Sequence, residues 1–128
     1  MRGTSRASLA AAEDRIEPLL RTVDSARLGQ ELFGVVGVLD SSAGLRRALT
    51  DPSRDASAKA DLVGRLFGGK VSDAAVDVVS GMVRDRWSSA RDLGDACEHL
   101  GAVAVVASAE DDGTLERLED ELFRFGRI

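Results

Sequence analysis

Apolar side chains recur three and four residues apart along most of the chain, as they do on the buried face of a helix. The first such stripe begins at Leu9 and continues in phase past Pro18 to Val23. A proline inside a helix removes one backbone hydrogen bond, so the helix over about residues 4–23 should kink or restart at Pro18. Because the stripe continues in phase, we predict one helix with a kink. A second helix is predicted to follow over about residues 25–40.

Capping residues and turns divide the next part of the chain into shorter helices. Serine or aspartate precedes each of them, where the side chain accepts a hydrogen bond from a free backbone N–H group. Gly68 and Gly69 are typical of a helix end. A strand is not predicted at Val103, Val105 and Val106, because the sequence offers no second strand to pair with it. The predicted helices cover about residues 43–50, 55–67, 72–87 and 91–109.

The end of the chain carries one more helical pattern, which begins with Thr114 as its N-cap. Its apolar positions are Leu115, Leu118, Leu122 and Phe125. The chain stops on FRFGRI, whereas a free C-terminus is usually polar, so we expect the protein to continue beyond Ile128. The predicted fold is therefore all-α: a six-helix bundle over residues 1–110, and a helical linker or extension over residues 111–128 that leads toward a missing C-terminal domain.

The predicted fifth helix is apolar over an unusually wide part of its circumference. Its apolar positions spread over about 180° when successive residues are placed about 100° apart. They are Val71, Ala75, Val76, Val78, Val79, Met82, Val83 and Trp87. Such a helix lies centrally in a bundle or presents part of its face to a partner. Arg86 falls near the middle of this arc, where either a solvated head group on a buried stem or a partner contact would satisfy its charge.

The composition narrows the possible classes of protein. The chain has 128 residues, enough for one domain, and its net charge of −5 with a sequence pI of about 4.9 argues against binding nucleic acid. No apolar run approaches the ~20 residues that cross a membrane, so direct membrane insertion is not expected. Cys97 is the only cysteine, which excludes an internal disulfide and a cysteine-built zinc site.

Each candidate for chemistry has a simpler structural explanation. The stretch GRLFGGK from Gly64 to Lys70 matches part of a phosphate-binding loop. However, Val71 follows where that loop needs a hydroxyl group, and a helix precedes where it needs a strand. His99 falls on the predicted solvent side of its helix, and Cys97 falls on the apolar side. We therefore expect no catalytic, cofactor-binding or metal-binding residue.

Three longer segments follow one another along the chain: LRRALTDPSRDASAKADLVGRLFGGKVS, VVSGMVRDRWSSARDLGDACEHL and LEDELFRFGRI. Together they resemble the delta subunit of the bacterial F-type ATP synthase, whose mitochondrial equivalent is the oligomycin-sensitivity-conferring protein. The first is similar to the family's short helix, proline turn, lysine-bearing helix and glycine break. The second is similar to its next helix, with an arginine-rich tip, and the helix after it. The third is similar to a segment of actinobacterial-type delta subunits that leads into further sequence.

The resemblance implies a six-helix N-terminal domain in a non-catalytic stator subunit, which joins the catalytic head to the peripheral stalk during proton-driven ATP synthesis. In the family, this domain binds the N-terminal helix of an alpha subunit between its first and fifth helices. Subunit b of the stalk would bind through the missing C-terminal region. The implied location is peripheral, at the cytoplasmic face of the plasma membrane, and no cofactor is implied. Carried onto this chain, the groove would be lined by Leu9, Ala12, Ile16, Val76, Val79, Met82, Val83 and Arg86.

Three alternatives stay open. The same residues could simply pack the first helix onto the fifth. Actinobacterial-type delta subunits also look extended, with more than one bundle-like segment, so this bundle could be an accessory copy that does not hold the alpha helix. The alternative function is an unrelated helical adaptor or regulator that binds a partner helix. A helix-turn-helix DNA-binding protein is the weakest hypothesis, because the net charge is acidic.

Overall fold

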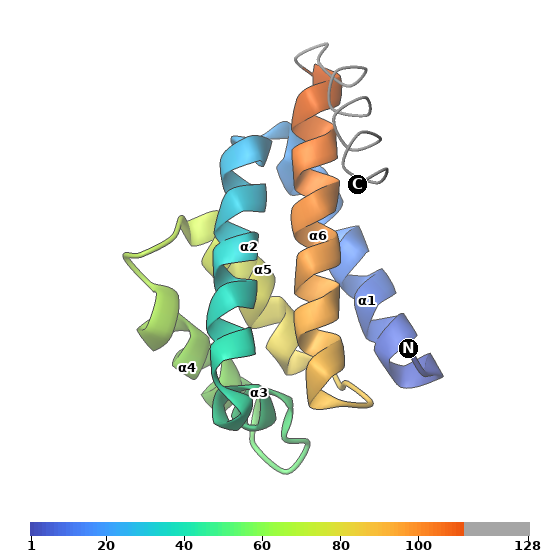
Figure 1. Cartoon of the computed structure of the whole chain (residues 1–128), viewed down its shortest axis with the longest axis vertical. Coiled ribbons are helices and arrows are strands. Elements are labelled where there is room, and N and C mark those ends of the chain that lie inside the picture. The colour runs from blue at the N-terminus through green and yellow to red at the C-terminus, as the bar shows by residue number, and fades with distance from the viewer. Residues whose placement is uncertain (112–128) are drawn as a thin grey trace, which may run out of the picture.

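The computed structural model describes residues 1–111, with the side chains of residues 1–110. Every regular element in this range is a helix, which confirms the predicted all-α fold with six α-helices for the described part of the chain. The elements are α1 (Gly3–Ile16), the short 3-10 helix η1 (Glu17–Arg21), α2 (Ser25–Ser41), α3 (Ala43–Thr50), α4 (Ala56–Phe67), α5 (Asp73–Arg84) and α6 (Ala90–Asp111) (Figure 1). None of these helices is both long and apolar enough to cross a membrane. The predicted loop and helical extension beyond Asp111 lie outside the described residues.

The first helix ends earlier than the sequence pattern predicts. α1 stops at Ile16, and the chain continues as η1, with Pro18 in its first turn. Proline has no N–H to donate to the carbonyl of Asp14, and its ring would clash with that group. The predicted single helix over residues 4–23 is therefore wrong: an α-helix and a separate 3-10 helix replace it. Leu19 still packs against the core, because the break leaves the apolar stripe on the same side.

α2 and α6 form an antiparallel pair at the centre of the bundle, with the other helices around it (Figure 1). Their backbones approach closely where Gly29 of α2 faces Gly101 of α6. A Cβ atom on Gly29 would lie 2.8 Å from the carbonyl oxygen of Gly101 and 3.2 Å from the backbone nitrogen of Val105. Only a residue without a side chain leaves room for this contact, so the two glycines set the distance between the central helices.

The start of α5 is tied to α2 by one serine. Ser72 is the N-cap, as predicted, and its Oγ accepts a hydrogen bond from the backbone N–H of Ala75. The Oγ–H of Ser72 also donates to the carboxylate of Glu31, at 2.7 Å, and so does its backbone N–H. This contact joins the middle of α2 to the first turn of α5 across a long stretch of sequence.

The end of α5 differs from the prediction. The helix stops at Arg84 and not near residue 87, because the backbone becomes extended at Asp85. Trp87 lies beyond the helix, and its Nε1–H donates a hydrogen bond of 2.8 Å to the carbonyl of Met82. The same carbonyl also accepts the backbone N–H of Asp85 at 3.2 Å, so the indole adds a second hydrogen bond at the helix end. Arg86 is exposed in the same connection, so it does not belong to the apolar arc in which it was predicted.

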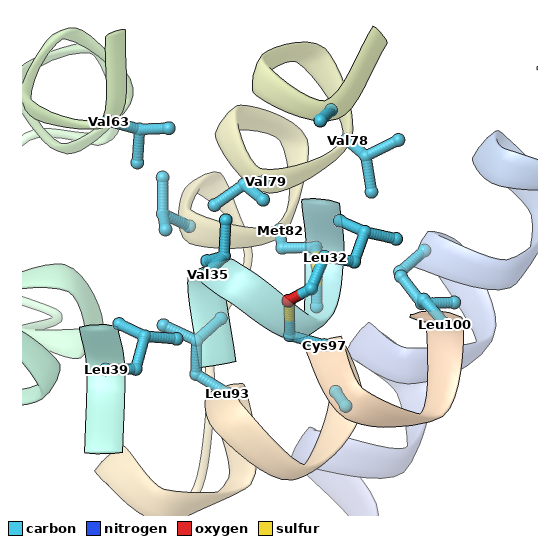
Figure 2. Close-up of a cluster of buried hydrophobic side chains, with 14 of the residues drawn as sticks. Leu32, Val35, Leu39, Val63, Val78, Val79, Met82, Leu93, Cys97 and Leu100 are labelled. Carbon is cyan, nitrogen blue, oxygen red and sulfur yellow. The ribbon is translucent and has the colours of Figure 1, made fainter. Parts of the chain in front are cut away.

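The core lies mainly between α2, α5 and α6. In Figure 2, side chains from these helices point toward one another, with Val63 of α4 beside them. The wide apolar arc of α5 follows from its position, because this helix contacts α1, α2, α4 and α6. The core confirms the predicted apolar faces of the second, fourth and sixth helices. Their buried members include Leu28, Leu32, Val35, Leu39, Ala60, Val63, Phe67, Leu93, Ala96, Cys97, Leu100 and Ala104.

Candidate functional site

The residues predicted to line a groove between the first and fifth helices fall into two groups. The buried group, each at most 2% exposed, consists of Ala12, Ile16, Val79, Met82 and Val83. The more accessible group consists of Leu9 and Val76, which are half-buried, and Arg86, which is exposed. The buried group belongs to the core, so a partner could contact these side chains only after the helices moved apart.

The accessible residues point in different directions. Gly81 of α5 faces α1, because a Cβ atom on it would lie 3.0 Å from Nε of Arg15. With about 100° between successive residues of a helix, Val76 lies about 140° around α5 from Gly81. By the same geometry, Leu9 lies about 120° around α1 from Arg15. The structure therefore places α1 against α5, but it does not gather the predicted residues on one open surface.

The outer surface of the α1–α5 contact consists of residues that the sequence analysis did not single out. Arg15 lies across Gly81, and its guanidinium forms an ion pair with Asp85 at 2.9 Å. The two side chains are 43% and 32% exposed, so this pair contributes only about 0–1 kcal/mol to stability. We call these three residues the α1–α5 surface. It is polar, with Gly81 beside the ion pair of Arg15 and Asp85.

Buried serines fix the start of α1 to the connection between α5 and α6. Ser8 Oγ–H donates to the carbonyl of Arg86. Ser5 Oγ–H donates to Asp92 at 2.7 Å, and its oxygen accepts the N–H of Ser88 at 2.7 Å. Neither serine was predicted to be buried, because a hydroxyl in a helix usually faces solvent. Their three-residue spacing, in phase with the buried stripe of the same helix, was the available signal.

The glycine-rich stretch after α4 is a helix end, as predicted. The N–H of Gly68 donates to the carbonyl of Gly64 at 2.9 Å, and Gly69 has a φ of 78°, in the left-handed region that favours glycine. Lys70 is exposed. Since an α-helix and not a strand precedes this turn, it is not a phosphate-binding loop. Within residues 1–110, no group of His, Cys, Asp and Glu side chains is placed to hold a metal ion.

The thiol of Cys97 is buried in the core, as predicted, and we expect it to resist modification in the folded protein. Its Sγ lies 3.6 Å from the carbonyl oxygen of Leu32, and the residue is 1% exposed (Figure 2). Burial, with a smaller contribution from Glu98, raises the pKa of the thiol from 9.0 to about 12. A thiol reagent should therefore react only with unfolded molecules, at a rate that rises with denaturant concentration.

Because the unfolded chain loses the proton of this thiol near pH 9.0 and the folded chain near pH 12, the free energy of unfolding should fall as the pH rises through this window.

The control for the predicted reactivity is a cysteine introduced at Asp95, which is exposed on the same helix. It should react in buffer at the rate of a free thiol. If Cys97 reacted at a comparable rate without denaturant, its burial in the folded protein would be contradicted.

The chain is similar along nearly its whole length to proteins named ATP synthase subunit delta. The relative from Beutenbergia cavernae is 57% identical over 129 residues, which cover 99% of this chain and 48% of the relative. The relatives from Streptomyces avermitilis and Kineococcus radiotolerans are each 50% identical to this chain. Each alignment covers 98% of this chain, and the two alignments cover 47% and 46% of the respective relatives. No protein-family model matches the chain. The chain spans about half the length of these relatives, and over about 99% of its own length it is homologous to the delta subunits of ATP synthases, mostly from actinobacteria.

Proposed function

We propose that this chain is part of a non-catalytic stator subunit of an F-type ATP synthase, which joins the catalytic head to the peripheral stalk. The observation that carries the proposal is the 57% identity to the Beutenbergia cavernae protein named ATP synthase subunit delta, along 99% of this chain. A stator must keep its shape while the rotor turns. A bundle whose first helix is fixed by Ser5 and Ser8 to the α5–α6 connection suits that requirement.

The proposed partner of this bundle is the N-terminal helix of an alpha subunit, docked along the α1–α5 surface. The buried residues Ala12, Ile16, Val79, Met82 and Val83 hold the two helices in place beneath this surface and would not contact the partner. The docked helix would cover Gly81, where the absence of a side chain allows a close approach of its backbone. Arg15 and Asp85 would form a polar rim, which is the usual arrangement at the edge of an interface.

The test is a titration of the whole chain with a peptide of the alpha subunit's N-terminal helix, followed by heat and by Trp87 fluorescence. Trp87 is a suitable reporter because it lies just beyond the end of α5. We expect saturable binding of one peptide per chain. Gly81→Arg should weaken the binding at least about tenfold, or about 1.4 kcal/mol, because a large cation beside Arg15 would occupy the docking surface.

Gly34→Arg is the matched control, since Gly34 also lies inside a helix and nothing stands within 4 Å of an added Cβ atom. This variant should bind the peptide as the wild type does. Unchanged binding by Gly81→Arg, or equal loss in both variants, would contradict docking at the α1–α5 surface. If the folded wild type binds no peptide, the bundle is an accessory copy that does not hold the alpha helix.

The stator role itself is tested by purifying ATP synthase from cells that carry a tagged form of the full protein. Recovery of the head and stalk subunits with the tag is the expected result. Recovery of the tagged protein without any ATP synthase subunit would overturn the stator role, whatever the peptide titration gave. An unrelated adaptor or regulator is not favoured, because the identity to proteins of this name extends along nearly the whole chain.

Two finer parts of the proposal follow from the resemblance. Contact with subunit b is assigned to sequence that this chain lacks, since the chain spans about half of its relatives. The location is peripheral, at the cytoplasmic face of the plasma membrane. Fractionation of membranes checks it: a low-salt wash should release the subunit together with the catalytic head and leave the membrane sector behind.

A further inference from the structure

A second groove lies on the other side of α1, where α1 and η1 pack beside the C-terminal half of α6 (Figure 1). It has a volume of about 520 Å³, and its apolar floor includes Ile16, Leu20, Val103 and Val106. Leu20 and Val103 are half-buried and Val106 is 36% exposed, so a partner can reach this floor without moving the helices apart. We call it the α1–α6 groove.

The rim of the α1–α6 groove is acidic. Glu13 and Glu17 stand on the α1 and η1 side, and Glu110 stands on α6. Glu13 pairs with His99 at 3.0 Å, whereas Glu17 and Glu110 form no ion pair within residues 1–110. The described residues that line the groove include no lysine or arginine. The rim therefore has a net negative charge, whichever charge state His99 adopts.

We propose that the α1–α6 groove binds an amphipathic helix of a second protein, which carries apolar side chains on one face and lysine or arginine beside them. The apolar side chains would cover the floor, and the cations would pair with the acidic rim. Such charge complementarity selects the partner and its register. The net charge of −5 also attracts a basic segment and repels a second copy of this chain.

A helix fits this groove better than an extended peptide does. An extended peptide usually binds by pairing its backbone with the free edge of a sheet, and every described element that borders this groove is a helix. An amphipathic helix needs only side-chain contacts with an apolar floor. The groove extends about 17 Å along α6 from His99 to Glu110, which matches about three turns of a docked helix.

The α1–α6 groove is separate from the α1–α5 surface. Glu13 on its rim and Arg15 lie about 160° apart around α1, because successive residues of a helix are about 100° apart. The proposal therefore does not rest on the docking of the alpha subunit's helix. Gly81→Arg, which should weaken that docking, should leave binding in the α1–α6 groove unchanged.

The test is a titration of the whole chain with a synthetic peptide of about 15 residues, which has leucines at helical spacing and lysines beside them. NMR signals of Val103 and Val106 should shift and should saturate at one peptide per chain. The same peptide with glutamate in place of every lysine should bind at least about tenfold more weakly. Added salt should reduce this difference, because salt screens exposed charges.

A substitution on the floor tests the apolar contact. Val106→Arg should weaken the binding of the lysine peptide at least about tenfold, because it places a charge where apolar side chains would be buried. Val38→Arg is the matched control, since Val38 is 41% exposed on α2 and does not line the groove. This variant should bind the peptide as the wild type does.

Substitutions on the rim test the charge contact. Glu17→Lys with Glu110→Lys should weaken the binding of the lysine peptide at least about tenfold, because cations would then face cations. Asp40→Lys with Asp61→Lys is the matched control, which changes the net charge equally at two exposed positions outside the groove. Circular dichroism should show that all of these variants keep the helical fold.

Three results would overturn the proposal. One is the absence of saturable binding, or binding that survives Val106→Arg. Another is equal binding of the lysine and glutamate peptides. The third is a different occupant in the chain without peptide. Signals of Val106 that shift on dilution would assign the groove to a second copy. Signals of residues 115–128 that shift in Val106→Arg would assign it to the chain's own sequence. None of these results bears on the stator role, because the proposal does not rest on it.

Discussion

Replacing Gly29 by alanine should destabilise the fold by about 3 kcal/mol, at the upper end of the usual cost of overpacking. The new methyl group would lie 2.6 Å from Cγ2 of Val105 and 2.8 Å from the carbonyl oxygen of Gly101. The side chain of Val105 can rotate away. The carbonyl group cannot, because it moves only if α6 separates from α2 and opens the core between them. Urea unfolding followed by circular dichroism measures the loss as a lower midpoint.

Gly34→Ala is the matched control, because it makes the same change in the same helix where nothing stands within 4 Å of the added Cβ atom. Alanine favours a helix over glycine by up to about 1 kcal/mol, so this variant should be more stable than the wild type. If glycine-to-alanine destabilises the protein at residue 29 and stabilises it at residue 34, the loss at residue 29 comes from the α2–α6 contact and not from helix propensity. Stabilisation by both variants would contradict the close approach of the two central helices.

Glu31→Ala should destabilise the fold by about 3 kcal/mol, because hydrogen bonds to a charged group contribute about 1.5–3 kcal/mol each. The Glu31 side chain is 13% exposed, and its carboxylate accepts hydrogen bonds from both the backbone N–H and the hydroxyl of Ser72. Alanine would leave both donors of Ser72 without this partner at the first turn of α5. Urea unfolding again measures the effect.

A double-mutant cycle with Ser72→Ala separates the interaction from the loss of the N-cap. The double variant should lose at least about 1 kcal/mol less stability than the sum of the losses in the two single variants, because the effects of substitutions at residues in contact are not additive. Gln30→Ala, at the exposed neighbouring position on α2, should change stability by about 0.5 kcal/mol or less. Additive effects of Glu31→Ala and Ser72→Ala would contradict the link between α2 and α5.

The apolar faces of α2, α4 and α6 could be predicted because each depends only on the spacing of residues within one helix. Leu32 and Leu39 of α2, and Cys97 and Leu100 of α6, are buried as their stripe indicates. The same local rule explains the predicted N-cap at Ser72. The prediction around Pro18 was wrong because two local effects competed there. The apolar stripe continued in phase, but the missing N–H ended the α-helix.

The candidate site was harder to predict. The sequence indicated that α1 and α5 are both apolar, but Val79 and Met82 inside the core cannot be told from residues on an open groove by composition alone. Which flank of α5 faces α1 depends on the crossing of the two helices. Only the structure brings Arg15 over Gly81, and only it buries Ser5 against Asp92.

The sequence by itself determined the all-α class, most helix boundaries in the described part of the chain, and the apolar face of each long helix. These properties follow from backbone hydrogen bonding and side-chain spacing within a few residues. The tertiary structure alone decided the close approach at Gly29 and Gly101, the link from Glu31 to Ser72, and the early end of α5 below Trp87. Each of these joins groups whose distance is set by how whole helices pack, and periodicity within one helix carries no information about that distance.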